Sequence, residues 1–202
     1  MPIAIFYDTE TTGLPDFGGP SSAVHQPHVV QIAAVAIDLE TREVLTELNR
    51  IVRPDGWTIP AEIAAIHGIS TERAAAEGSP EEEVMEEFMT LWNSNLRIAH
   101  NEAFDARIVR IALARFAPGL MDSWANGKAF CTMQKATPLV KAPPTARMLK
   151  AGRTGYKSPS LTETYKHFFG KTFDGAHDAL VDVKACVEVY WKLRHDSPDV
   201  PG

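Results

Sequence analysis

Near its start the sequence reads Ile3-Ala4-Ile5-Phe6-Tyr7-Asp8-Thr9-Glu10, an apolar run that ends in two acids. A short apolar run bounded by polar residues is typical of a buried β-strand. Side chains alternate along a strand, so Asp8 and Glu10 share one side at its carboxyl end. Paired acids there suit a hard divalent cation such as Mg²⁺, which prefers oxygen ligands. Taken alone, the pair is equally compatible with a polar turn.

Further apolar runs at 29–39 and 47–52 predict two more strands, and their short links favour an antiparallel meander. Ser79 as a capping residue, with Pro80 at the first helical position, marks the start of one helix. The expected helices cover 59–66, 80–92, 102–116, 161–169 and 178–194, and the remaining strands cover 96–99 and 129–133. This order predicts an α/β fold with a mixed central β-sheet flanked by helices.

The chain has 202 residues, of which 45% are hydrophobic and 23% are charged. This composition predicts a single folded domain over 1–202, with mobile loops at 15–27 and 140–160, which are rich in Pro and Gly. No run is apolar and long enough to span a membrane, and the N-terminus lacks the features of a secretory signal. Two isolated cysteines suggest a reducing compartment, so we expect a cytoplasmic protein without a membrane partner.

The charge is unevenly distributed along the sequence. Residues 128–171 hold nine Lys and Arg but one acid, Glu163, whereas the rest of the chain has 11 basic residues against 25 acids. A basic region of this kind suits a polyanion such as a single nucleic-acid strand. Lys150, Arg153 and Lys157 are the candidate phosphate contacts, although a solvated lysine-rich loop without a partner would have the same composition.

Two further acids follow histidines at expected helix starts. His100-Asn101-Glu102-Ala103-Phe104-Asp105 joins a strand end to a helix, and His177-Asp178-Ala179-Leu180-Val181-Asp182 begins the last helix. Asp178 is most simply a helix cap. Taken singly, each histidine is more typical of a structural role than of catalysis.

Together these motifs, in this order, resemble the DEDDh family of 3′→5′ exonucleases. That family includes the epsilon proofreading subunits of bacterial DNA polymerase III, oligoribonuclease and RNase T. The resemblance spans positions 8 to 182, and Ile66-His67-Gly68-Ile69-Ser70 and Ser160-Leu161 also match the family's pattern. The departures are the long loop at 15–27, Gln31 where proofreading members often have Glu, and the basic segment 140–160. They bear on substrate choice rather than on chemistry.

The resemblance implies a ribonuclease H-like exonuclease fold and a site for two divalent ions, Mg²⁺ or Mn²⁺. Phosphodiester hydrolysis needs an activated water and neutralised phosphate charge, which two such ions supply. By resemblance, His177 would be the general base, and the terminal nucleotide would contact Thr11, Thr12, Leu14, Asn101 and Phe104. The implied metal ligands are Asp8, Glu10, Asp105 and Asp182.

The implied activity is 3′→5′ removal of nucleoside 5′-monophosphates from single-stranded ends. DNA is the first choice of substrate, in proofreading or end processing, with a DNA polymerase or another replication protein as a possible partner. The alternative is RNA trimming of the oligoribonuclease or RNase T type. A non-catalytic nucleic-acid-binding module would not need four acids, and a His-Asp phosphohydrolase would be all-helical. The sequence does not indicate the oligomeric state.

Overall fold

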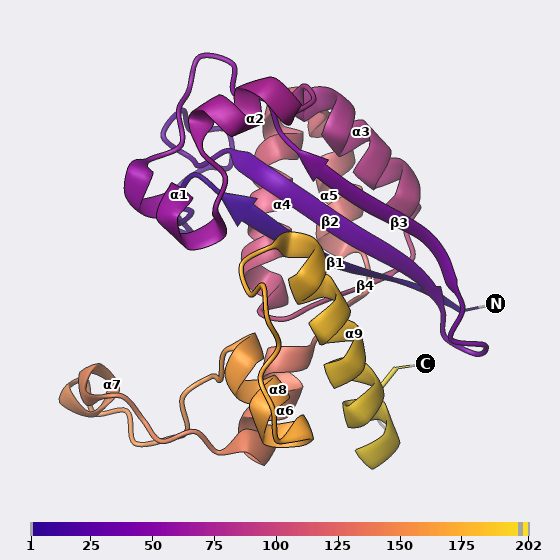
Figure 1. Cartoon of the computed structure of the whole chain (residues 1–202), viewed down its shortest axis with the longest axis vertical. Helices are drawn as coiled ribbons and strands as arrows, with labels where there is room; N and C mark the ends of the chain where they lie inside the picture. Colours follow the sequence, from indigo (N-terminus) through magenta and orange to yellow (C-terminus); the bar gives the residue numbers. More distant parts are fainter. Residues whose placement is uncertain (1, 198–199, 202) are drawn as a thin grey trace.

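The computed structural model of the protein describes residues 2–197 and 200–201. Its central sheet has the strand order β3-β2-β1-β4-β5 (Figure 1). β1 pairs antiparallel with β2 and parallel with β4, so the sheet is mixed, as the sequence predicts. The strands are β1 (Ile3–Thr11), β2 (Val29–Asp38), β3 (Val44–Ile51), β4 (Leu96–Ala99) and β5 (Ala129–Cys131).

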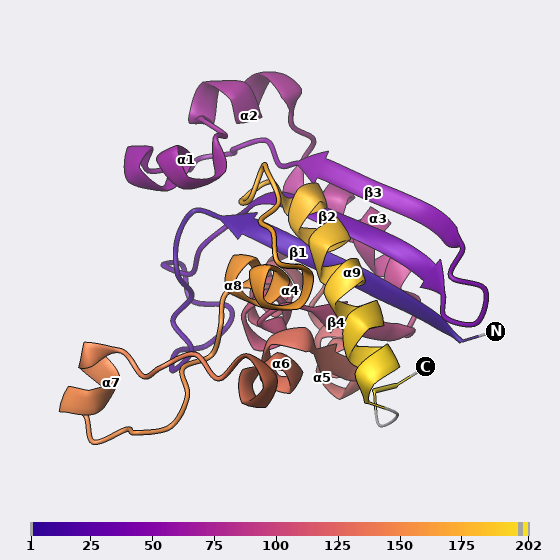
Figure 2. The ribbon, with the colours of Figure 1, turned by 60° about the horizontal axis from the view of Figure 1, so that its bottom comes forward.

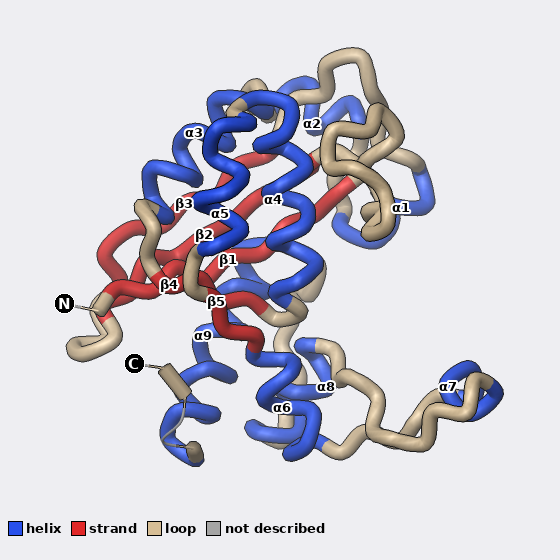
Figure 3. The backbone as a smooth tube through the Cα atoms, turned by 180° about the vertical axis from the view of Figure 1, so that it is seen from behind, coloured by secondary structure: helices blue, strands red, loops and turns tan. Residues whose placement is uncertain are grey.

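Helices cover both faces of this sheet. Helices α3, α4 and α5 lie on one face, and α9 crosses the other beside α8 and α6 (Figures 1 and 3). Within the described part of the chain, no helix has the length and apolar character needed to cross a membrane. The helices are α1 (Ala61–His67), α2 (Thr71–Glu77), α3 (Glu81–Trp92), α4 (Glu102–Phe116), the short 3₁₀ helix η1 (Pro118–Leu120), α5 (Met121–Asn126), α6 (Thr132–Val140), α7 (Ala146–Lys150), α8 (Leu161–Phe169) and α9 (Ala179–Asp196).

Alternate residues of β1 belong to two different parts of the core. Ile5 and Tyr7 pack in the cluster with α3 and α4, whereas Ala4 and Phe6 pack in the cluster with α9. Every residue of β2 is buried, which explains why its sequence is mostly apolar, with Gln31 and Asp38 as exceptions, rather than alternating. β1 is therefore a central strand with helices on both sides.

The carboxyl-terminal part of β1 is paired with another strand on one side only. β1 pairs with β2 as far as Thr11, but with the shorter β4 only from Ala4 to Phe6. Beyond Phe6 the main chain of β1 has no strand beside it on the β4 side. The acids of β1 lie in this stretch, next to the start of α4.

The structure corrects several local expectations. Ser79 does not cap α3: its N-cap is Pro80, without a side-chain bond, and Ser79 instead bridges Val52 in parallel. The strand expected over 129–133 ends at Cys131, where α6 begins. Helices α2, α5, α6 and α7 were not predicted, because helices this short depend on tertiary packing more than on their own sequence.

The two loops expected to be mobile differ in how they contact the rest of the protein. Residues 15–27 accept hydrogen bonds from Arg107 and Arg115 of α4. Residues 141–157, here called the basic arm, contain α7 and project from the body on the same side as α1 (Figures 1 and 2). Mobility of either loop stays a prediction, although the bonds to 15–27 oppose it.

Phe88 of α3 ties this helix to the sheet, because its ring lies 5.5 Å from Tyr7 and 5.8 Å from Trp124. The side chain is fully buried. We expect Phe88→Ala to lower the free energy of unfolding by about 3–5 kcal/mol through lost burial and the cavity left behind. Urea unfolding measures the change. Leu45→Ala, at an exposed position of β3, is the control, and an equal effect of both would contradict this account.

Candidate active site

The first two acids lie side by side on β1. Asp8 is in register with Ala33 of β2 and Glu10 with Gln31, so both continue the row of Ala4 and Phe6 on the α9 face. The shared side that the sequence predicted is therefore the side from which α9 approaches.

Asp105 reaches the same place from α4, on the other face of the sheet. Its Oδ1 accepts hydrogen bonds from the main-chain N of Thr9 at 3.0 Å and from Thr9 Oγ1 at 2.7 Å. The Thr9 amide is free for this contact because β4 does not extend past Phe6. Asn101, with φ 77, turns the chain sharply before α4 and so brings Asp105 to the strand end.

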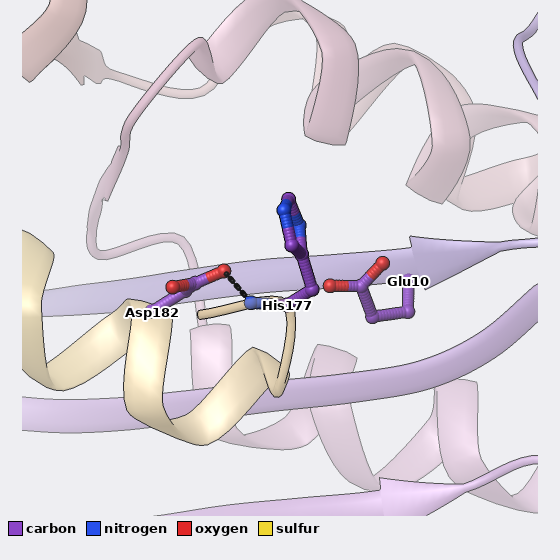
Figure 4. A group of neighbouring side chains, drawn as sticks. All are labelled: Glu10, His177 and Asp182. Atoms are coloured by element: carbon purple, nitrogen blue, oxygen red, sulfur yellow. Dashed lines mark hydrogen bonds between the residues drawn. The ribbon is translucent and has the colours of Figure 1, made fainter. Parts of the chain in front are cut away.

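Asp182 and His177 come from the start of α9. Asp178 caps this helix, as predicted, with Oδ1 accepting from the amides of Leu180 and Val181. Asp182 lies in the first turn, and its Oδ2 accepts from the main-chain N of His177 at 3.0 Å. Ligand atoms of Glu10, His177 and Asp182 lie within 4.8 Å of one another (Figure 4).

His177 has an unusual backbone conformation. Its φ is 71, in the left-handed region that non-glycine residues rarely adopt. Such conformations are costly and concentrate at functional sites. The side chain is exposed and points away from Asp182, while the main-chain N faces that acid (Figure 4).

These residues line an open cleft of about 340 Å³. It combines the four acids with polar and apolar side chains from β1, the β1–β2 loop, α4 and α8. The lining residues are Asp8, Thr9, Glu10, Leu14, His100, Asn101, Phe104, Asp105, Leu161, His177 and Asp182.

Burial raises the pKa of all four acids, and repulsion from other members of the set adds to the rise for Asp8 and Glu10. Burial, followed by Asp105 and Asp182, holds the pKa of Asp8 well above its usual value. Burial and the same two acids raise the pKa of Glu10 to about 8. Burial raises the pKa of Asp105 to about 7, although the bonds from Thr9 oppose the rise. Burial also raises the pKa of Asp182, against the favourable contact with His177.

The donor set fits a divalent cation. Carboxylates that repel one another are stabilised by positive charge placed between them. Asp182 Oδ1 is buried and, among the described residues, has no hydrogen-bond partner, as an oxygen reserved for a ligand would be. The structure brings Asp8, Glu10, Asp105 and Asp182 to one cleft, and their role as metal ligands stays a prediction.

The other predicted residues divide into two groups. Leu14, Asn101 and Phe104 line the cleft. Thr11 and Thr12 lie beside it with their hydroxyls engaged, Thr11 donating to Gly13 O and Thr12 accepting from the amide of His28.

The basic residues Lys150, Arg153 and Lys157 lie on the basic arm and do not line the cleft. Lys157 donates to both oxygens of Glu163, at 2.6 and 2.8 Å, and so supports the cap of α8. Its proposed contact with phosphate would have to compete with this pair.

Sequence reasoning noted Gln31 only as a departure from the family pattern and missed its structural role. Its Oε1 accepts from the main-chain N of Ala179 at 3.2 Å, and its Nε2 donates to Asn49 at 3.0 Å. It therefore joins β2 to the start of α9, next to Asp182. A buried polar residue within an otherwise apolar strand was the available signal.

His100 has the structural role that a lone histidine suggests. Nε2 lies 3.0 Å from Pro159 O and Nδ1 lies 3.0 Å from Thr132 Oγ1. A carbonyl only accepts, so Nε2 carries the proton and donates. His100 thus fastens the segment before α8 to the end of β4.

The raised acid pKa values predict how stability depends on pH without metal. Folded acids hold protons that the unfolded chain releases near pH 4, so stability is lost as pH rises through the folded values. In EDTA we expect Tm to fall between about pH 6.5 and 8.5. Millimolar Mg²⁺ should raise Tm at the upper end, because the ion binds only the folded cluster. Thermal unfolding at each pH measures both effects.

Glu10→Gln is the matched variant for this experiment. It removes the group with the pKa of about 8, so it should flatten the slope in EDTA and weaken the Mg²⁺ effect. Burial lowers the pKa of His67 and His100, so these histidines oppose the fall near pH 6.5; both proteins contain them, and the difference between wild type and Glu10→Gln reports the acid. A wild-type Tm that is flat in EDTA and insensitive to Mg²⁺ would refute the metal assignment.

Comparison with known proteins agrees with this geometry. An exonuclease family model, that of RNase T, matches residues 5–190. No curated protein matches the sequence significantly. Many solved structures do, and the chain spans about two-fifths of the length of those described next.

Three of these structures illustrate the likeness. Exonuclease I of Escherichia coli in its zinc-bound complex with single-stranded DNA has a TM-score of 0.74 at 19% identity, covering 98% of this chain and 42% of that one. The same enzyme with a dA16 oligonucleotide gives 0.75 at 19%, covering 99% and 42%. Exonuclease I of Methylocaldum szegediense gives 0.69 at 21%, covering 99% and 42%.

The shared fold is the ribonuclease H-like arrangement expected from the motifs, a mixed five-stranded sheet between helices. Since the family model covers most of the chain, and the four acids of the motifs meet in one cleft, the chain belongs to the exonuclease family that the RNase T model describes.

Proposed function

We propose that this protein is a metal-dependent 3′→5′ exonuclease that releases nucleoside 5′-monophosphates from single-stranded ends, preferentially of DNA. The observation that carries the proposal is the convergence of four carboxylates from β1, α4 and α9 on one cleft. Packing does not require this arrangement, because burial and repulsion penalise it.

Asp8, Glu10, Asp105 and Asp182 would hold two divalent ions, Mg²⁺ or Mn²⁺. When bound, such ions lower the pKa of water and neutralise charge on the phosphate and the leaving oxygen. Thr9 fixes Asp105, and the His177 amide fixes Asp182, so the carboxylates are positioned before any ion arrives.

His177 would take the proton from the attacking water. Histidine exchanges protons near neutral pH, and this imidazole is exposed at the cleft beside Glu10 and Asp182. The left-handed backbone directs its main-chain N to Asp182 and leaves the ring free for substrate.

Leu14, Asn101 and Phe104 would contact the terminal nucleotide, with the main chain of Thr11 and Thr12 nearby. An aromatic face such as that of Phe104 stacks on any base and so tolerates sequence. DNA is the first choice because the similar exonuclease I structures hold DNA oligonucleotides. RNA is the second, because the family model bears the name of a ribonuclease. A polymerase partner stays a prediction.

The direct test uses 5′-labelled DNA and RNA of one sequence. With Mg²⁺ we expect a ladder that shortens from the 3′ end, faster on DNA, and no products in EDTA. Asp8→Ala should abolish turnover. His177→Ala should lose activity by about two to four orders of magnitude through loss of the general base.

The Mg²⁺-dependent Tm shift separates the two roles, since His177→Ala should keep it and Asp8→Ala should lose it. Faster cleavage of RNA would reverse the substrate preference. Wild-type turnover in His177→Ala would remove the base assignment. Intact binding without cleavage of either polymer would make the protein a binding module.

The basic arm would contact phosphates upstream of the cleft. Lys150 and Arg153 are exposed, and the arm projects on the side of the molecule where the β1–β2 loop lies (Figure 2). Binding through phosphate contacts releases counterions, so affinity falls with salt in proportion to their number.

Reversing these charges tests the arm. Lys150→Glu combined with Arg153→Glu should weaken binding and reduce the slope of log affinity against log salt by about 0.7 per lost contact on a single strand. Lys192→Glu, near the other end of α9 from Asp182, controls for a charge reversal remote from the cleft. Fluorescence anisotropy with labelled DNA measures the slopes, and equal slopes in all variants would exclude the arm from binding.

A further inference from the structure

The loop between β1 and β2, residues 12–28, exposes three apolar side chains. Leu14 is 86% exposed, Phe17 61% and Val24 99%. Leu14 lines the cleft, but Phe17 has no role in the site described so far. A large aromatic side chain left in water beside a binding cleft is a candidate contact for a ligand.

The main chain on either side of Phe17 is held firmly. Arg107 of α4 donates from Nη2 to Asp16 O at 2.7 Å and to Gly19 O at 2.6 Å. Gln26 bonds the Asp16 main chain in both directions, accepting from N at 3.0 Å and donating to O at 2.9 Å. The Asp16 carboxylate accepts from the amide of Gly18 at 2.9 Å. Phe17 is therefore an exposed side chain on a fixed backbone.

Holding the loop in this way requires Arg107 to bury its charged side chain. It is 5% exposed, and its hydrogen bonds go to two carbonyls and to Ser21 Oγ at 2.8 Å rather than to a carboxylate of the described residues. Burial lowers the pKa of this guanidinium, as expected for a desolvated cation. Burying a charged side chain without an ion pair costs free energy. What these hydrogen bonds provide is a fixed conformation of the loop.

The position of Arg107 on α4 relates Phe17 to the cleft. Phe104 and Arg107 are three residues apart, and so lie on the same face of the helix. Phe104 lines the cleft, while Arg107 donates hydrogen bonds to Asp16 and Gly19, on either side of Phe17. Leu14, on the same loop, also lines the cleft. The loop thus runs from Leu14 at the cleft to the carbonyls held by Arg107, which lies about one turn of α4 beyond Phe104.

We propose that Phe17 is a stacking residue for an unpaired base upstream of the terminal nucleotide, on a platform that Arg107 holds in place. The inference rests on the proposed function and deepens it by adding a second base contact. A phenyl ring stacks on any base, so the contact favours single strands without selecting a sequence. Fixing the backbone that carries the ring reduces the entropy lost on binding.

Two substrates separate this contact from the chemistry. A nitrophenyl ester of thymidine 5′-monophosphate offers the terminal nucleotide alone, whereas a DNA oligonucleotide also reaches Phe17. Phe17→Ala should raise KM for the oligonucleotide by at least about fivefold and leave turnover of the ester unchanged. Phe17→Trp should restore the oligonucleotide KM, because indole also stacks.

Oligonucleotides without a base at the second, third or fourth position from the 3′ end locate the contact. At one position the missing base should raise the wild-type KM by the same factor as Phe17→Ala. The same substrate should not raise the KM of Phe17→Ala any further, because the missing base and the missing ring remove the same interaction.

Val24→Ala is the matched control, since it truncates a more exposed apolar residue of the same loop. It should change neither KM. An oligonucleotide KM unchanged in Phe17→Ala, or additive losses at every abasic position, would overturn the stacking role. Wild-type protein that cleaves neither substrate would instead overturn the exonuclease function, and this inference with it.

Discussion

Burial of four carboxylates together in one cleft is the constraint on which the rest of this structure depends. Each of the four has a raised pKa, and burial is the largest cause in every case. A chain can keep such a cluster only if the surrounding fold holds each acid in place. The first turn of α9 does so for Asp182, where the helix dipole favours negative charge, and Thr9 does so for Asp105.

The mixed sheet makes these contacts possible. β1 continues past the end of its parallel neighbour β4, which frees the Thr9 amide for Asp105 while Asp8 and Glu10 face α9. Gln31, opposite Glu10 on β2, fastens the start of α9 to the sheet. Acids from both faces of the sheet therefore meet at one strand end. Exonuclease I shares the fold at about one-fifth identity, so most of the sequence can differ while the same mixed sheet and flanking helices are kept.

Two segments outside the core, the β1–β2 loop and the basic arm, differ in how they are held to the body of the protein. The β1–β2 loop is fixed by Arg107 and Gln26, whereas the basic arm projects from the body (Figure 2). Solvent-facing segments can vary without disturbing the acids. Substrate choice within this family is therefore expected to lie in such segments, while the hydrolytic chemistry lies in the strand and helix ends.

The sequence by itself predicted the strands, the long helices and the five residues that the fold brings to one cleft, because their signals are local: apolar runs, helix starts, and acids and a histidine at strand and helix ends. It did not reveal the contact of Gln31 with the start of α9, the short helices, the true cap of α3 or the hydrogen bonds from Arg107 to a loop that it suggested was mobile. Tertiary structure decided these, because each depends on partners distant in the chain. Arg107 and Gly19 are 88 residues apart, and Gln31 and Ala179 are 148 apart, so no local pattern encodes their contact.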